Sequence, residues 1–159
     1  MGALFVMIYN IRMDTFGIGG LIAFILGWLI TQLGKMIGDL LKKKRALSIK
    51  EVLHAAMRSG GMPSGHTASF LALTTYLGIK YGFASGIFML ALCTAAIVIY
   101  DAVNVRYAVG VHGKLLNIMA EEGKHRDRKV RIVEGHTVPQ VIVGGIIGTL
   151  IGIVVGMIM

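Results

Sequence analysis

Four long stretches of this chain contain no Asp, Glu, Lys or Arg. They cover residues 15–34, 59–79, 81–100 and 135–159, and each has about 20 residues or more, enough for a helix to cross the roughly 30 Å hydrocarbon core of a bilayer. Hydrophobic residues make up 55% of the chain and charged residues 15%, unlike the average soluble protein. We therefore predict an all-α integral membrane bundle of about four spanning helices, forming one domain over residues 1–159.

The remaining segments are too short or too polar to span. Residues 1–14 carry Arg12 and are predicted to form an interfacial helix. Residues 113–135 are a charged insert whose first part has apolar residues at helical spacing. We expect this part to extend the third helix or to lie on the membrane surface, with a loop after it. The single cysteine, Cys93, excludes a disulfide framework within the chain.

The net charge of +8 is concentrated in two loops. One follows the first predicted span and the other joins the third span to the fourth, so four alternating helices place both loops on the same side. The positive-inside rule makes that side cytoplasmic and indicates a protein of the cell membrane. Nucleic-acid binding is disfavoured, because these loops contain only one aromatic residue, Tyr107, among their basic residues.

A glycine-proline loop with the sequence GGMPSGH, residues 60–66, precedes the second predicted helix. Pro63 restricts its own backbone, and Gly65 allows another group to approach the chain closely. The backbone N–H groups of Ser64, Gly65 and His66 are expected to be free donors at a helix start, where an anion is their natural partner. The loop therefore predicts a phosphate site at the membrane surface.

Polar residues from the other predicted helices reach the same depth. His66 opens the second helix, Asp101 and Arg106 close the third, and His136 opens the fourth, while Lys35 lies near the end of the first. An ionisable residue within a span is costly without a partner and is a functional candidate. We expect these side chains to meet at the cytoplasmic face.

These segments resemble a known family. GGMPSGHTA at 60–68, DAVNVR at 101–106, EGHT at 134–137 and QVIVGG at 140–145, preceded by Gln32-x-x-Lys35, resemble the divergent branch of the type 2 phosphatidic acid phosphatases, relatives of the vanadium haloperoxidases. The resemblance runs from about residue 17 to the C-terminus. It implies a phosphomonoesterase or pyrophosphatase that acts without a metal or other cofactor, through a phosphohistidine. The implied substrates are membrane lipids: polyprenyl phosphate or diphosphate, phosphatidic acid or phosphatidylglycerophosphate.

The resemblance also implies the catalytic roles. His66 corresponds to the acid/base histidine, Arg106 to the arginine that holds the phosphate and His136 to the nucleophile. His112 is the alternative nucleophile, because five residues separate it from Arg106 as in the wider family. We favour His136, which follows the charged insert as in the divergent branch. Asp101 is expected to orient a histidine or Arg106.

The expected phosphate-binding set is Lys35, Arg58, Ser64, Gly65 and Arg106, and Gln140 and Gln32 are expected to orient other groups. Gln140 stands where the family has an acid. It can accept a hydrogen bond from an imidazole but cannot stabilise an imidazolium by charge. Simpler interpretations remain: Lys35 can pair with Asp39, and Arg58 can contact lipid head groups.

The last predicted helix has a glycine every fourth residue from Gly144 to Gly156. Such a stripe lets two helices approach closely, either inside the bundle or between two copies in a homodimer. A second function also remains open, that of a non-catalytic lipid-phosphate binder or accessory membrane protein. The neutral Gln140 favours this alternative.

Overall fold

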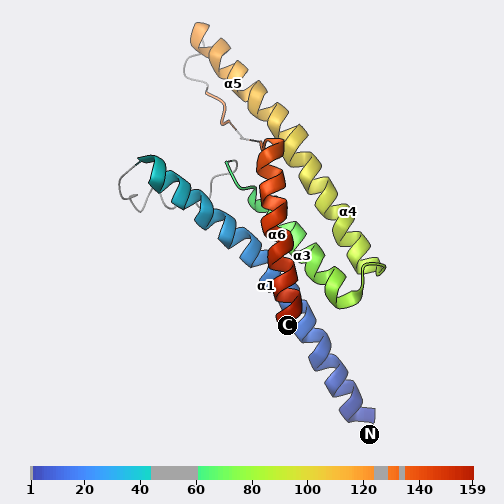
Figure 1. Ribbon diagram of the computed structural model, residues 1–159. Helices are drawn as coiled ribbons and strands as arrows, with labels where there is room; N and C mark the ends of the chain where they lie inside the picture. The colour runs from blue at the N-terminus through green and yellow to red at the C-terminus, as the bar shows by residue number, and fades with distance from the viewer. Residues whose placement is uncertain (1, 44–60, 124–128, 133–134) are drawn as a thin grey trace.

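All regular elements described in this protein are helices. The computed structural model describes residues 2–43, 61–123, 129–132 and 135–159. The elements are α1 (Gly2–Lys43), α3 (Gly65–Tyr81), α4 (Gly86–Tyr100), the π-helical turn η1 (Asp101–Val105), α5 (Arg106–Glu122) and α6 (Val138–Ile158). Figure 1 shows that α1 and α4 run toward the end of the molecule at which α3 and α6 begin. The predicted all-α bundle is confirmed.

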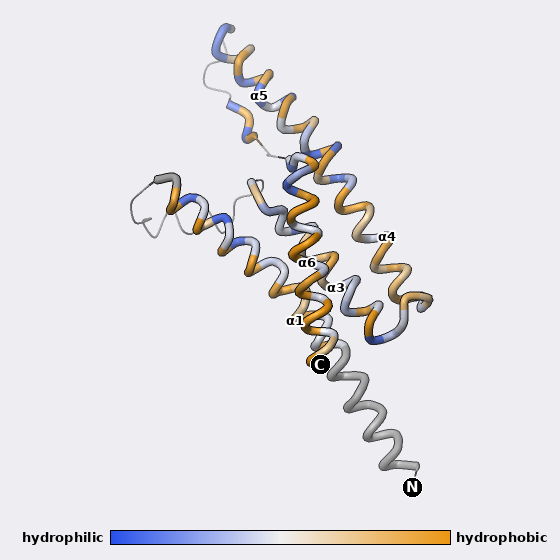
Figure 2. The backbone as a smooth tube through the Cα atoms, in the orientation of Figure 1, coloured by the Kyte–Doolittle hydropathy of each residue, from blue (hydrophilic) through white to orange (hydrophobic). Residues whose placement is uncertain are grey.

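Three helical stretches are long and apolar enough to cross a membrane: Gly17–Leu41, Gly86–Glu122 and Val138–Ile158. Their apolar character is visible along α4 and α6 in Figure 2. Helix α3 has 17 residues, which corresponds to about 26 Å and is shorter than the hydrocarbon core. The predicted number of four spans is therefore not confirmed, although α1, α3, α4 and α6 alternate in direction (Figure 1).

Two helical stretches continue beyond their uncharged segments, one against the prediction and one in agreement with it. Helix α1 continues without interruption from Gly2 to Lys43, so the interfacial helix predicted for residues 1–14 is not a separate element. The only prolines of the chain are Pro63 and Pro139. Helix α1 therefore contains no proline that would interrupt its helical hydrogen bonds. Helices α4 and α5 are continuous through η1, which confirms the predicted helical extension at the start of the insert.

Helix α3 lies at the centre and contacts α1, α4 and α6. Its closest approach is to α6, where the glycine stripe faces it. A Cβ atom on Gly144 would lie 2.5 Å from the carbonyl oxygen of Ser64, and one on Gly148 would overlap the carbonyl of Ala68. The stripe therefore packs inside one chain, which is the first of its two predicted uses, and a homodimer would need a different surface.

Helix α1 packs on another face of α3 in the same way. A Cβ atom on Gly27 would lie 2.8 Å from the carbonyl oxygen of Ala68. Tyr76 of α3 is fully buried between these helices and belongs to a small apolar core formed by Ala23, Ala72, Tyr76, Leu77 and Val155. Because glycine and alanine allow backbones to touch, the helix starts and ends are held at defined heights relative to one another.

Candidate functional site

The polar residues predicted to meet do converge at one end of the bundle. His66 experiences the charges of Arg106, His136, Lys35 and Asp101. These five groups come from α1, α3, the α4–η1–α5 stretch and the segment before α6. Figure 2 shows hydrophilic residues gathered where α6 begins and where α4 passes into α5. The end at which α3 and α6 start is therefore the candidate site.

The start of α3 is built by Ser64 as its N-cap. The Ser64 side chain accepts a hydrogen bond from the Thr67 N–H at 3.5 Å and lies 2.9 Å from the Thr67 hydroxyl, so it satisfies part of the helix start. Gly65 follows in close contact with α1, where an added Cβ would lie 3.2 Å from the Thr31 hydroxyl. His66 is exposed beside these buried residues and is thus accessible to a ligand.

One predicted donor is already occupied. The backbone N–H of Ser64 donates to the carbonyl of Gln140 at 3.1 Å, and Ser64 is fully buried. The expectation of a free Ser64 N–H is therefore wrong, because that group joins α3 to α6. Gly65 and His66 occupy the first helical positions, whose N–H groups have no acceptor within their own helix. These two amides remain the candidate donors of the loop.

Arg106 and Asp101 form an ion pair across the π-helical turn. The guanidinium Nε lies 2.6 Å from the carboxylate Oδ2, and both side chains are partly exposed. In an α-helix, residues five apart lie about 140° around the axis. The wider winding of η1 returns the fifth residue to nearly the same face, and π-turns of this kind are frequent at functional sites. The turn thus lets Asp101 orient Arg106 near His66.

His136 lies just before α6 and is 3% exposed. Its backbone N–H donates to the carbonyl of Ala102 at 3.0 Å, which ties the segment to η1. Its imidazole Nδ1 lies 3.1 Å from Gln140 Oε1. His136 is therefore held both to the third helical pass and to the first turn of α6.

The surroundings of Gln140 favour one tautomer of His136. The Thr137 N–H donates to Gln140 Oε1 at 3.2 Å, so this atom is an acceptor, and an Nδ1–H of His136 can donate to the same oxygen. In this tautomer the lone pair of a neutral imidazole is on Nε2, the nitrogen that a nucleophilic His136 would use.

Burial lowers the pKa of His136 below the ordinary value of histidine, and the charges of Lys35 and Arg106 act in the same direction. Hydrogen bonds to Gln140 and to the backbone of Gly61 raise the pKa and oppose this effect in part. The balance favours neutral imidazole at physiological pH, the form that a nucleophile requires.

The remaining predicted residues fall into three groups. Lys35 and Gln32 lie on α1, the first half-buried and the second buried, and Lys35 acts electrostatically on both histidines. His112 is exposed on α5 and is not among the groups whose charges act on His66. Arg58 lies outside the described residues. The structure thus brings His136, and not His112, to His66.

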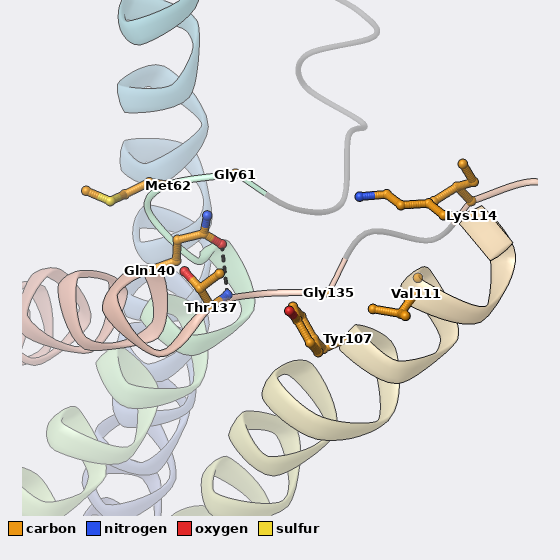
Figure 3. Close-up of a pocket in the computed structure, with 10 residues that line it drawn as sticks. Gly61, Met62, Tyr107, Val111, Lys114, Gly135, Thr137 and Gln140 are labelled. Carbon is orange, nitrogen blue, oxygen red and sulfur yellow. Dashed lines mark hydrogen bonds between the residues drawn. The ribbon is translucent and has the colours of Figure 1, made fainter.

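A cavity of about 450 Å³ lies beside Gln140 and the two residues that flank His136 in the sequence, Gly135 and Thr137, whereas His136 itself is not among its lining residues. Figure 3 shows it between the Gly61 loop, the start of α6 and α5, with Lys114 extending across it toward Gly61. Its lining residues are Gly61, Met62, Tyr107, Gly110, Val111, Lys114, Ile132, Gly135, Thr137 and Gln140. Within the described part of the chain, no group of three or more His, Cys, Asp or Glu residues could hold a metal ion.

Two contributors were not predicted from the sequence. Gly61 contacts the His136 imidazole through its backbone and has a positive φ of 80°, which favours glycine. Thr137 is the N-cap of α6, and its N–H orients Gln140. The Thr137-x-x-Gln140 spacing is that of a capping box, a signal that could have identified Thr137, whereas the Gly61 contact depends on the fold.

Comparisons with known proteins identify the family of this chain. A family model described as the Divergent PAP2 family matches residues 19–151. The chain is 28% identical over 105 residues to a Bacillus subtilis (strain 168) protein described as "Uncharacterized membrane protein YuiD", over 57% of this chain and 66% of that protein. The match thus spans slightly less than two thirds of that relative. No solved structure gives a significant match. Since the family model covers most of the chain, this membrane protein belongs to the Divergent PAP2 family.

Proposed function

We propose that this protein hydrolyses a membrane lipid phosphate without a metal ion, through a phosphohistidine on His136. Family membership suggests a phosphatase-related role. The observation that carries the specific proposal is the convergence of His66 and His136 with the cations Lys35 and Arg106. Two imidazoles and two fixed positive charges are the groups that a metal-independent phosphoryl transfer needs.

The first step is attack by Nε2 of neutral His136 on phosphorus. The N–P bond forms while the bond from phosphorus to the lipid oxygen breaks, and protonated His66 gives its proton to the departing alkoxide. The Nδ1–H bond to Gln140 keeps the imidazole in the reactive tautomer. The products of this step are the lipid alcohol and a phosphohistidine.

The second step is hydrolysis of the phosphohistidine. His66, now neutral, takes a proton from water, whose oxygen attacks phosphorus as the N–P bond breaks. Inorganic phosphate leaves and neutral His136 is restored. Lys35, Arg106 and the amides of Gly65 and His66 stabilise the charge on the phosphoryl oxygens in both steps. Arg58, predicted from the sequence, would add a further cation.

The substrate reaches the site from the cytoplasmic leaflet of the cell membrane. The basic loops assign this side by the positive-inside rule, and they attract anionic head groups. The candidate lipids are polyprenyl phosphate or diphosphate, phosphatidic acid and phosphatidylglycerophosphate. Each offers a terminal phosphoryl group to the site while its tail remains in the bilayer.

A non-catalytic lipid-phosphate binder is the second candidate. It is favoured by the neutral amide of Gln140 beside His136, because an amide cannot stabilise a positively charged imidazole as a carboxylate would. In a binder, the same cations would hold the phosphate without bond cleavage.

The test is phosphate release from these lipids by the purified protein in detergent with EDTA present. His136→Ala is expected to abolish release and His112→Ala to preserve it, and a phosphorylated protein should be trapped after alkaline quenching in wild type but not in His136→Ala. Release that is lost in His112→Ala and kept in His136→Ala would contradict the assignment. Tight lipid-phosphate binding without turnover, equal in wild type and His136→Ala, would establish the binder instead.

A further inference from the structure

We propose that α5 holds His136 in position through the segment that precedes it, an arrangement called here the splint. Asn117 is the residue of α5 that positions this segment. The inference concerns the described residues 129–132 and 135–136, called here the strap, which comprise the end of the charged insert and His136. Only its kinetic test depends on the proposed function, since the contacts that carry it do not involve the imidazoles of His66 and His136.

Asn117 binds the strap through both polar atoms of its side-chain amide. Its Nδ2 donates to the Val130 carbonyl at 3.0 Å, and its Oδ1 accepts from the Val130 N–H at 2.8 Å. A primary amide is the side chain that can complete both backbone groups of one residue in this way. The pairing fixes the direction of the strap as well as its distance from α5.

The strap then follows α5 in the antiparallel direction. A Cβ atom on Gly113 would lie 3.8 Å from the Ile132 Cα, and a Cβ atom on Gly135 would overlap the backbone of Tyr107. The last contact of the series is the His136 N–H to the Ala102 carbonyl, at 3.0 Å. The helix positions used, 117, 113, 107 and 102, decrease as the strap positions 130, 132, 135 and 136 increase.

The face of α5 that receives the strap is adapted to it. Gly110 and Gly113 are the buried residues among those described in α5, although most of that helix is exposed. Two glycines at this spacing leave a shallow surface on which an extended chain can lie close to the helix backbone. The strap therefore packs on a glycine surface of α5, and Asn117 holds the end of the strap that lies farther from His136.

The splint also connects Arg106 with His136. Helix α5 continues from η1, which carries the Asp101–Arg106 ion pair. The same rigid stretch thus sets the position of the guanidinium directly and that of the His136 imidazole through the strap. Loss of the Asn117 contact should loosen His136 while leaving Arg106 in place.

The structural test compares Asn117→Ala with Asn104→Ala. Asn104 is a matched control because its amide donates to the Tyr100 carbonyl one turn earlier in the same helical stretch, at 3.2 Å. Hydrogen exchange should accelerate at the Val130 and His136 amides in Asn117→Ala and stay at wild-type rates in Asn104→Ala. Asn117→Asp, which keeps an acceptor for the Val130 N–H but sets a carboxylate oxygen against the Val130 carbonyl, should accelerate exchange as well. Unchanged exchange in both Asn117 variants would overturn the splint.

The functional test asks whether His136 itself is displaced. An NMR titration of His136 should show its pKa moving up toward the ordinary value in Asn117→Ala, since burial is the main cause of its lowering. For phosphate release, kcat should fall about 10- to 100-fold, as misplacement of a reacting group by about 1 Å does, with KM within about twofold.

The two proposals can fail separately. A wild-type protein that releases no phosphate would end the proposed function, while exchange and titration would still decide the splint. A pKa of His136 and a kcat that are unchanged despite faster exchange would show that Asn117 has only a structural role, and would overturn its assignment as a positioning residue.

Discussion

The two halves of this bundle are held together in different ways. Helices α1, α3 and α6 touch backbone to backbone through glycines. In an 18-residue apolar segment of each helix, 33% of α1 and 39% of α6 is buried. In the stretch Gly86–Glu122 only 11% of the apolar segment is buried; this stretch contacts α3 through α4 and makes polar contacts near η1 and along α5. We call α1, α3 and α6 the tight half and Gly86–Glu122 the loose half. The site lies on the boundary, with Lys35 and His66 from the tight half and Arg106 from the loose half.

This contrast teaches that close backbone packing is confined to one half, whereas both halves supply groups to the site. The tight half sets the heights of the helix ends, because a shift of α6 along α3 would bring residues larger than glycine against the α3 backbone, and it contributes Lys35 and His66. The loose half contributes Arg106 and the segment that carries His136. Substitutions at the packing glycines should therefore act on stability, and substitutions of the site residues should act on activity.

The largest effect is expected at Gly148. In Gly148→Ala the new methyl group overlaps the Ala68 carbonyl, and neither backbone can move aside. We expect the free energy of unfolding to fall by about 2–3 kcal/mol, as for overpacked cores, measured by thermal or denaturant unfolding in detergent. Gly38→Ala is the control, since an added Cβ there meets nothing within 4 Å. Equal stability of the two variants would contradict the close α3–α6 packing that characterises the tight half.

Arg106 tests the contribution of the loose half. Arg106→Ala removes the proposed charged contact to phosphate, worth about 1.5–3 kcal/mol, so kcat/KM for phosphate release should fall roughly 10- to 100-fold while the unfolding midpoint changes little. Lys80→Ala, which removes a positive charge from the last turn of α3 at the opposite end, should keep wild-type kcat/KM. A similar loss in both variants would mean that net charge, and not the position of Arg106, matters.

Gln140 tests how the halves meet at His136. In the proposed mechanism neutral His136 attacks, so activity should fall as the pH drops through its pKa, which lies below the ordinary value of 6.5. In Gln140→Glu the carboxylate can still accept from the Thr137 N–H, but its charge raises the pKa of His136. The acid limb of the pH profile of kcat should therefore move to higher pH. A limb that stays in place or moves to lower pH would exclude His136 as the titrating nucleophile.

The smallest effects are expected on the outer faces, where the two halves should behave alike. Leu90 on α4 is 69% exposed and Leu150 on α6 is 58% exposed, and both are expected to face lipid. Leu90→Ala and Leu150→Ala should each change the free energy of unfolding by no more than about 0.5 kcal/mol. A loss well above this in Leu90→Ala would reveal a packing partner for the loose half.

The meeting of the site residues at one end of the bundle could be predicted, because it follows from the alternating direction of successive helices. Runs of apolar residues define the helices, alternating passes bring the starts of α3 and α6 to one end, and His66 and His136 stand at those starts. Asp101 and Arg106 end the intervening pass, so their meeting needed no detail of packing. The choice of His136 over His112 is supported by the same logic, since His112 continues outward along α5.

The parts that were not predicted depend on contacts between distant residues. The Ser64 N–H was expected to be free, but the Gln140 carbonyl occupies it, and no local pattern near Ser64 shows this. The π-helical turn also has no clear signal, because the sequence from 101 to 105 suits an ordinary helix. The packing of the strap against Gly113 likewise could not be predicted, because it depends on α5 and Val130 lying side by side in the fold.

The short length of α3 has a consequence for how a lipid meets this protein. If Lys80 at one end of α3 lies at one bilayer interface, then His66, about 20 Å away along the helix axis, lies several ångströms below the opposite one. A bilayer adapts to a short apolar element by thinning around it, at a modest energetic cost. Such a local depression would lower the surrounding head groups to the level of the imidazole, so a lipid could present its phosphate without rising out of its leaflet.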